Sequence, residues 1–218
     1  MKKDYLITFG MVLLTIGLVF IVTRDFFLSF ASDYKYLGGF VKFFFLASLG
    51  DIIGKRIKTK AWSIPTGMLY KAIVWGIIGM LVVMMFGLFD QGVWFLQDNN
   101  LLPNTDIIFV HAILVSTIMN VTFGPMMMAF HRVTDTFIEQ RGNNNKISIL
   151  DSVNMVNWPA FISFVVFKTI PLFWIPAHTI TFIISPEYRV IFAALLGIVL
   201  GLLLGMFQDK KETNWKRK

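Results

Sequence analysis

The chain has 218 residues, of which 56% are hydrophobic and only 15% are charged, whereas soluble domains carry about 25% charged residues. This composition excludes an ordinary soluble domain and indicates one polytopic domain in a lipid bilayer. No cysteine is present, which excludes disulfides, thiolate metal sites and cysteine nucleophiles. The net charge of +7 comes from short basic blocks between apolar runs, a pattern typical of membrane orientation, so no nucleic-acid partner is expected.

The apolar runs predict an all-α transmembrane bundle, because a spanning helix needs roughly 17 to 25 residues. The first run is followed by Arg24 and Asp25 and is longer than the apolar core of a signal peptide, so a retained helix is favoured over a cleaved one. The predicted spans are residues 6–22, 37–53, 68–89, 107–130, 153–170 and 189–207.

The stretch before the last span is too long for one upright helix and contains Pro159, Pro171 and Pro176. Proline lacks a backbone donor and normally kinks or ends a helix. We therefore expect a span that ends near Ile170, followed by an interfacial or re-entrant helix over 173–184. Broken backbone at membrane depth has to lie against protein or water.

Small residues recur every fourth position in the last span and form a ridge on one helix face. Such ridges allow neighbouring helices to approach closely, within one chain or between copies, so a homo-oligomer is a possible assembly. The predicted packing residues are Ala193, Gly197, Gly201 and Gly205, with Gly76 in the third span.

Basic residues alternate between loops in a way that predicts orientation. With six spans, one side holds Lys2 and Lys3, the block 55–60, Arg132 to Lys146, and the C-terminal lysines, whereas the loop over 88–106 has three aspartates and no basic residue. The positive-inside rule then places both termini on the cytoplasmic side of the membrane. The expected location is the plasma membrane.

Polar residues within the spans are the candidates for a solute path. Thr117, Asn120 and His131 share a face of the fourth span with Gly124. This face would line a water-filled path. The alternative is that these side chains only bond neighbouring helices, worth about 0.6 kcal/mol on average in membranes.

Charged residues within the spans are further candidates. Lys42 either extends to the interface or lines a polar path, while Lys168 is expected to extend to the interface near the end of its span.

Catalytic motifs are missing from the sequence: it has no phosphate-binding glycine loop, no HExxH and no nucleophile elbow. His111, His131 and His178 lie on different segments, and a lone histidine in a membrane is more often a hydrogen-bonded packing residue than a ligand. We therefore expect no enzyme, no cofactor and no metal site.

A set of residues follows a fixed order along the chain: Gly50-Asp51, Gly124-Pro125, and then Trp174, Pro176, His178, Thr181, Pro186, Arg189 and Val190. This order resembles the signature of the Mpv-seventeen and peroxisomal membrane protein family, of which this chain would be a divergent, bacterial member. Gly50-Asp51 looks like the family's Gly-Asp, and Gly124-Pro125 looks like its Gly-Pro. His178 and Thr181 stand where that family has Gln and Asn, and the first span has no counterpart in a four-helix family.

The resemblance implies a small pore for metabolites. The residues carried over to the pore or its gate are Asp51, Asp151, His178, Thr181 and Arg189.

Together these patterns predict an integral membrane channel or transporter for small solutes, with passage along a polar seam between helices. One alternative is a gradient-driven exporter, for example of amino acids, which would show saturable flux. The other is a membrane scaffold that transports nothing and uses the glycine ridges for assembly.

Overall fold

The computed structural model describes the backbone of residues 33–215 and the side chains up to Leu202, except those of Lys58 and Gly201. Every regular element in this part of the chain is a helix, as predicted. The predicted first span, 6–22, lies outside the described residues. The four long helices are α2 (Lys35–Thr59), α3 (Met68–Asp98), α4 (Ile108–Gly142) and α8 (Pro186–Trp215). The shorter ones are α5 (Ile149–Met155), α6 (Trp158–Ala160), the π-helix η1 (Phe161–Trp174) and α7 (Ile175–Ile183).

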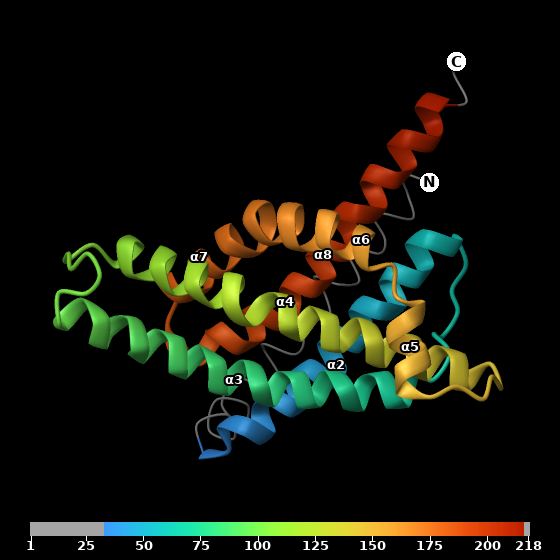
Figure 1. Cartoon of the computed structure of the whole chain (residues 1–218), viewed down its shortest axis with the longest axis horizontal. Coiled ribbons are helices and arrows are strands. Elements are labelled where there is room, and N and C mark those ends of the chain that lie inside the picture. Colours follow the sequence, from blue (N-terminus) through green and yellow to red (C-terminus); the bar gives the residue numbers. More distant parts are fainter. Residues whose placement is uncertain (1–32, 216–218) are drawn as a thin grey trace, which may run out of the picture.

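The helices end at residues that suit tight turns. Lys60 is left-handed at φ 59° and its N–H bonds the carbonyl of Arg56, which closes α2. Asn100 and Asn144 are left-handed after α3 and α4, a conformation that asparagine tolerates better than most residues. Short connections then reverse the chain, so that α3 and α4 run antiparallel (Figure 1).

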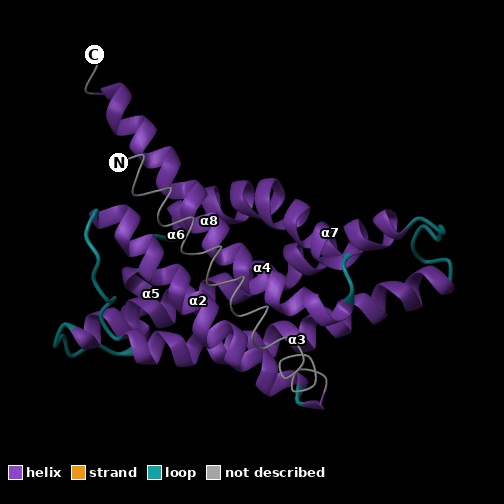
Figure 2. Ribbon diagram, turned by 180° about the vertical axis from the view of Figure 1, so that it is seen from behind, coloured by secondary structure: helices purple, strands orange, loops and turns teal. Residues whose placement is uncertain are grey.

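The long helices pack in a fixed order. α3 contacts both α2 and α4, α7 packs on the other side of α4, and α8 lies against α2. Figure 2 shows the same bundle from behind, with α8 extending beyond the other helices at its C-terminal end. The fully buried core lies where α3, α4 and α7 meet, at Ile78, Ala112, Val115 and Phe182.

The two ends of the bundle carry opposite charges. At the end called the basic end here, α2 and α4 end, α3 begins and α5 follows, and Gly142 packs against Thr66. At the opposite, acidic end α3 and α7 end, and α4 and α8 begin. The segments at the basic end contain Lys55, Arg56, Lys60, Arg141 and Lys146, and those at the acidic end contain Asp98, Asp106 and Glu187.

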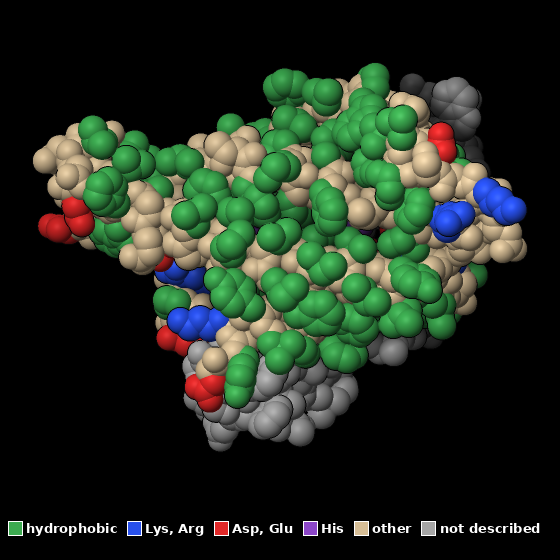
Figure 3. Space-filling model, turned by 60° about the horizontal axis from the view of Figure 1, so that its bottom comes forward, with side chains coloured by type: hydrophobic (Ala, Val, Ile, Leu, Met, Phe, Trp, Pro, Cys, Tyr) green, Lys and Arg blue, Asp and Glu red, His purple; other side chains and the backbone are tan. Residues whose placement is uncertain are grey.

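Four helical segments of the described chain are long and apolar enough to cross a membrane: Lys35–Ile57, Met68–Asp98, Ile108–Gly142 and Trp158–Ile183. Hydrophobic side chains cover most of the broad face in Figure 3, and charged ones lie toward its margins. This is a membrane protein. The segments overlap the predicted spans 37–53, 68–89, 107–130 and 153–170 without sharing their bounds, and the predicted last span, 189–207, falls within α8.

The loop predicted over 88–106 is wrong for most of its length, because this stretch is largely helical. α3 continues to Asp98 and α4 to Gly142. The 31 residues of α3 extend over about 46 Å at 1.5 Å per residue, whereas the hydrocarbon core is about 30 Å thick. Composition therefore changes where the helix leaves the hydrocarbon, while the backbone hydrogen bonding continues.

The predicted break near Ile170 is also wrong, because η1 passes directly into α7. Pro171 lies within η1, whose backbone bonds follow the π-helical pattern, and Pro176 lies in the first turn of α7. The break lies earlier, at Val156, which is extended between α5 and α6. The Asn157 side chain then accepts a bond from the Ala160 N–H and starts the new helix.

Glycines mark close helix contacts, only partly where predicted. A Cβ at Gly76 would lie 2.5 Å from the Phe40 ring, as expected for a packing residue. A Cβ at Gly39 would lie 2.8 Å from the carbonyl oxygen of Gly79, so the backbones of α2 and α3 touch.

The predicted ridge of α8 contacts other described helices only in part. Ala193 is buried, but Gly197 is exposed and a Cβ there would have no described neighbour within 4 Å. The buried side chains of α8 are Ala193, Ala194, Leu196 and Ile198, which is a different stripe. The side-chain surroundings of Gly201 and Gly205 lie outside the described part, and an oligomer through this ridge stays a prediction.

Candidate functional site

Asn120 and His178 form a buried polar pair between α4 and α7, near the middle of the bundle. The Asn120 amide nitrogen donates to the Ser116 carbonyl at 2.8 Å, which leaves its oxygen facing the Nδ1 of His178 at 3.0 Å. The His178 Nδ1 therefore carries the hydrogen of this bond. Ser116 donates to the carbonyl of Ile175 at 2.7 Å and joins the same two helices. We call Ser116, Asn120 and His178 the central group.

Aromatic rings enclose the His178 side of the central group. The Trp174 ring stacks on His178 at 5.3 Å between centroids, and Phe86 of α3 meets it edge-on at 5.8 Å. The indole nitrogen of Trp174 is buried and has no hydrogen-bond partner in the described structure. A buried donor without a partner is unusual in a folded protein and is open to an acceptor on a ligand.

The two predicted threonines behave differently from the central group. Thr181 is fully buried, but its hydroxyl donates to the carbonyl of Ala177 in its own helix at 3.0 Å. Thr117 is exposed and does not share the buried surroundings of Asn120, so its predicted place on one path-lining face with Asn120 stays a prediction. Burial on α4 follows the helices that cover it: Gly124 of the same row is buried, and a Cβ there would meet Ile170 of η1 at 3.6 Å.

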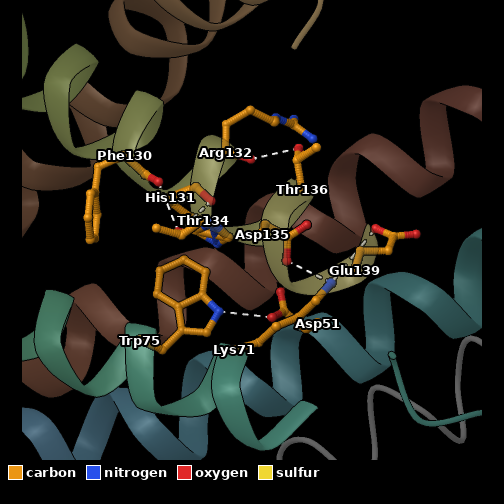
Figure 4. A network of polar contacts seen from close by, with 10 residues as sticks. All are labelled: Asp51, Lys71, Trp75, Phe130, His131, Arg132, Thr134, Asp135, Thr136 and Glu139. Carbon is orange, nitrogen blue, oxygen red and sulfur yellow. Dashed lines mark hydrogen bonds and ion pairs between the residues drawn. The ribbon is translucent and has the colours of Figure 1, made fainter. Parts of the chain in front are cut away.

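At the basic end, Asp51 and His131 converge on one tryptophan (Figure 4). The Trp75 indole N–H donates to the Asp51 carboxylate at 2.9 Å, and the His131 ring meets the Trp75 ring edge-on at 4.0 Å between centroids. Both residues were predicted from the sequence, on separate spans. Trp75, which was not singled out from the sequence, joins them across α2, α3 and α4.

A salt bridge lies beside this contact. The Lys71 ammonium is 2.7 Å from the Asp135 carboxylate and 3.9 Å from Glu139, and Figure 4 shows all three beside Asp51. We call Asp51, Lys71, Trp75, His131 and Asp135 the basic-end cluster. Lys71 precedes Trp75 by four residues, and His131 precedes Asp135 by four residues. This spacing places each pair on one face of its helix, so the sequence could have indicated the cluster.

The acidic end holds a second network, around Asp90 of α3. One carboxylate oxygen of Asp90 lies 3.0 Å from the Nε2 of His111, and the other lies 3.0 Å from the Arg189 guanidinium. The Nδ1 of His111 faces the Gln97 side-chain oxygen at 2.8 Å, and Trp94 stacks on the imidazole at 4.0 Å. We call Asp90, Trp94, Gln97, His111 and Arg189 the acidic-end cluster.

Arg189 also ties the turn between α7 and α8 to this cluster. Its guanidinium donates to the carbonyl of Phe182 at 3.1 Å and to that of Ile184 at 3.2 Å. Arg189 was a predicted path residue, and in the structure its guanidinium contacts one carboxylate and two carbonyls. Asp90 and Gln97 were not singled out from the sequence, since their segment was taken for a loop.

The two candidate lysines lie in different surroundings. Lys42 is buried, which favours the alternative in which it lines a polar path over extension to the interface. Lys168 is exposed, but it lies near the middle of the helical run 158–183 and not near the end of a span. Its predicted position depended on the break near Ile170, which the chain does not have.

Asp151 lies apart from all three groups, on the exposed surface of α5. Ser148 and Asp151 form a capping box in which the carboxylate accepts from the Ser148 backbone N–H at 2.7 Å and from its hydroxyl at 2.8 Å. These bonds, the backbone one first, hold the pKa of Asp151 below its ordinary value. This explains Asp151 as a helix cap.

In the described chain, no group of three or more His, Asp or Glu side chains is arranged to hold a metal ion. Comparison with known proteins found no matching family model, no matching curated protein and no matching solved structure. The resemblance to the Mpv-seventeen family therefore stays a prediction from the residues quoted for it.

Proposed function

We propose that this membrane protein is a channel or transporter for small polar solutes, and that they pass the central group between α4 and α7. The observation that carries the proposal is the central group itself, with the buried, unpartnered indole N–H of Trp174 beside His178. Amide, hydroxyl and imidazole groups offer both donors and acceptors without a fixed charge. This chemistry suits a small solute that has hydrogen-bond acceptors of its own.

Polar groups at both ends of the bundle support a path that reaches both membrane surfaces. The acidic-end cluster includes Arg189 of α8, and the basic-end cluster includes Asp51 and His131. Ionisable residues within membrane spans are costly and usually serve function. None of these groups requires chemistry on the solute, so we propose transport without catalysis.

The charges of the two ends support an orientation in the plasma membrane. The basic end holds lysines and arginines from three segments, whereas the acidic end has aspartates and Arg189. We propose that the basic end faces the cytoplasm. The C-terminus is then cytoplasmic, because α8 begins at the acidic end. The N-terminus would share that side if residues 6–22 form a span.

The test is flux into liposomes of purified protein, with uncharged and charged solutes of graded size. The informative variant is Asn120→Leu with His178→Phe, which removes both partners of one bond and leaves neither unpaired. We expect this double variant to lower flux at least tenfold. Thr181→Val is the matched control, since its hydroxyl serves only its own helix, and it should keep wild-type flux.

The outcomes separate the alternatives. Non-saturating flux that the double variant abolishes supports a channel, and saturable flux of one solute class supports a carrier such as an exporter. Wild-type protein that moves no solute would overturn the proposal in favour of a scaffold.

A further inference from the structure

The acidic-end cluster contains a histidine whose two ring nitrogens both face acceptors. The orientation of Gln97 can be assigned from its neighbour, because its amide nitrogen lies 2.7 Å from the carbonyl oxygen of Pro103. If the amide were flipped, two oxygens would face each other at that distance. The Gln97 oxygen therefore faces the Nδ1 of His111 at 2.8 Å, and Nδ1 has to donate.

The other ring nitrogen meets a carboxylate. The Nε2 of His111 lies 3.0 Å from one oxygen of Asp90, whose second oxygen is 3.0 Å from Arg189. Arginine stays protonated in proteins, so the Asp90 carboxylate beside it is ionised and only accepts. Nε2 therefore also has to donate.

We infer that His111 is a proton-binding site, and that the doubly protonated imidazole is the form that joins α4 to α3 at the acidic end. Gln97 and His111 are both fully enclosed, at 0% and 1% exposed. Water therefore cannot replace a lost bond without the structure opening. A neutral imidazole would place a lone pair against either Asp90 or the Gln97 oxygen.

Proton release therefore weakens a contact that several elements share. The charged groups that face His111 are Asp90 from α3 and, behind it, Arg189 from α8, whereas Asp98, Asp106 and Glu187 at this end are exposed. Arg189 holds the turn between α7 and α8 through two carbonyls. Loss of the proton is expected to loosen α4 from α3 and, through Asp90, from that turn.

This inference deepens the proposed function by naming the proton as its regulating or coupling ion, and its flux readout rests on that function. The proton readout does not. We would label histidine with ¹⁵N, place the protein in lipid nanodiscs and record ring-nitrogen shifts between pH 5 and 9. The His111→Gln variant identifies which signals belong to His111.

We expect the wild-type His111 to show two protonated ring nitrogens at neutral pH and to lose one as pH rises. Gln97→Glu places a carboxylate opposite Nδ1 and should keep the second proton to a higher pH than in the wild type. Gln97→Met, of similar size without an acceptor, should lose it at a lower pH than the wild type. Tryptophan fluorescence and elution volume show that each variant is folded.

Flux separates failure of the site from failure of the function. If the inference is correct, solute flux changes with pH in the wild type, and His111→Gln removes that dependence. A neutral His111 throughout pH 5 to 9 would overturn the proton site and leave the proposed transport standing. A protonated His111 in a protein that moves no solute would overturn the transport and leave the site standing.

Discussion

The two ends of this bundle are built from similar residues but are closed in different ways. At the acidic end, the side chains of Asp90, Arg189 and His111 are 14%, 13% and 2% exposed. At the basic end, Lys71 is 10% exposed, but its partners Asp135 and Glu139 are 25% and 55% exposed. The charged groups of the first network are mostly enclosed, whereas those of the second open toward solvent.

This difference predicts how much each end depends on its charges. A charge that loses its partner inside protein stays desolvated, whereas an exposed charge regains water. The planar guanidinium of Arg189 also holds a carboxylate and two carbonyls at once, and the ammonium of Lys71 is a single point of charge. Loss of one charged partner should therefore destabilise the protein more at the acidic end than at the basic end.

The largest effect is expected from Asp90→Asn, which breaks the enclosed network. The amide leaves Arg189 without its counter-charge and His111 with a weaker acceptor. Removing one partner of a buried ion pair costs about 3 to 5 kcal/mol. The measurement is the free energy of unfolding in mixed micelles with rising sodium dodecyl sulfate, followed by circular dichroism.

Asp98→Asn is the control, since Asp98 is exposed at the same end. It should change the free energy of unfolding by no more than about 0.5 kcal/mol. Equal effects of the two variants would show that the enclosure of Asp90 is irrelevant.

A smaller loss is expected at the basic end from Trp75→Phe. This variant keeps an aromatic ring against His131 but removes the donor to Asp51. Leaving a partly buried carboxylate without that bond costs about 1 to 3 kcal/mol. The same unfolding measurement applies, with the exposed Trp62→Phe as the matched control. A loss as large as that of Asp90→Asn would remove the contrast between the ends.

The smallest effect concerns pH and the exposed cap of α5, which follows α4 at the basic end. The pKa of Asp151 is lowered by its bonds from Ser148. The ionised carboxylate therefore stabilises the cap fully when the pH is above the ordinary aspartate pKa of about 3.9. That contribution is lost as pH falls through the lower value of the folded protein. Hydrogen exchange at the Asp151 amide, corrected for the intrinsic rate, should show weaker protection below about pH 4.

Ser148→Ala should reduce this pH dependence, because the hydroxyl accepts from the Asp151 amide and donates to its carboxylate, while the backbone N–H of residue 148 can still donate to that carboxylate. Protection that stays unchanged in the variant would show that the capping box does not hold α5.

The sequence predicted the membrane class and most spans, since apolar length depends on local composition alone. It also selected Asn120 and His178, but not their contact, which joins residues 58 positions apart. Thr117 lies in the same row of α4 as Asn120 but is exposed. Helical periodicity places residues in a row, and only the neighbouring helices decide which members of the row are covered.

The acidic-end cluster escaped prediction because aspartates after an apolar run were taken for a loop. Asp90, Trp94 and Gln97 are spaced by four and three, which is a helical spacing, and His111 follows at the start of the next helix. A search for helical periodicity in the residues that follow the apolar run would have placed Asp90, Trp94 and Gln97 on one helix face. The partner on α8, Arg189, could be placed only by the fold.

The touching backbones of α2 and α3 restrict how this protein can move. Gly39 and Gly79 leave no space between these helices, and Phe40 covers Gly76 one turn away. The two helices are therefore expected to travel as a rigid body, because sliding would drive side chains into the opposite backbone. If the protein alternates between inward-open and outward-open states as a transporter would, we expect α4 to move against that body, across the surface where His111 meets Asp90 and Gln97.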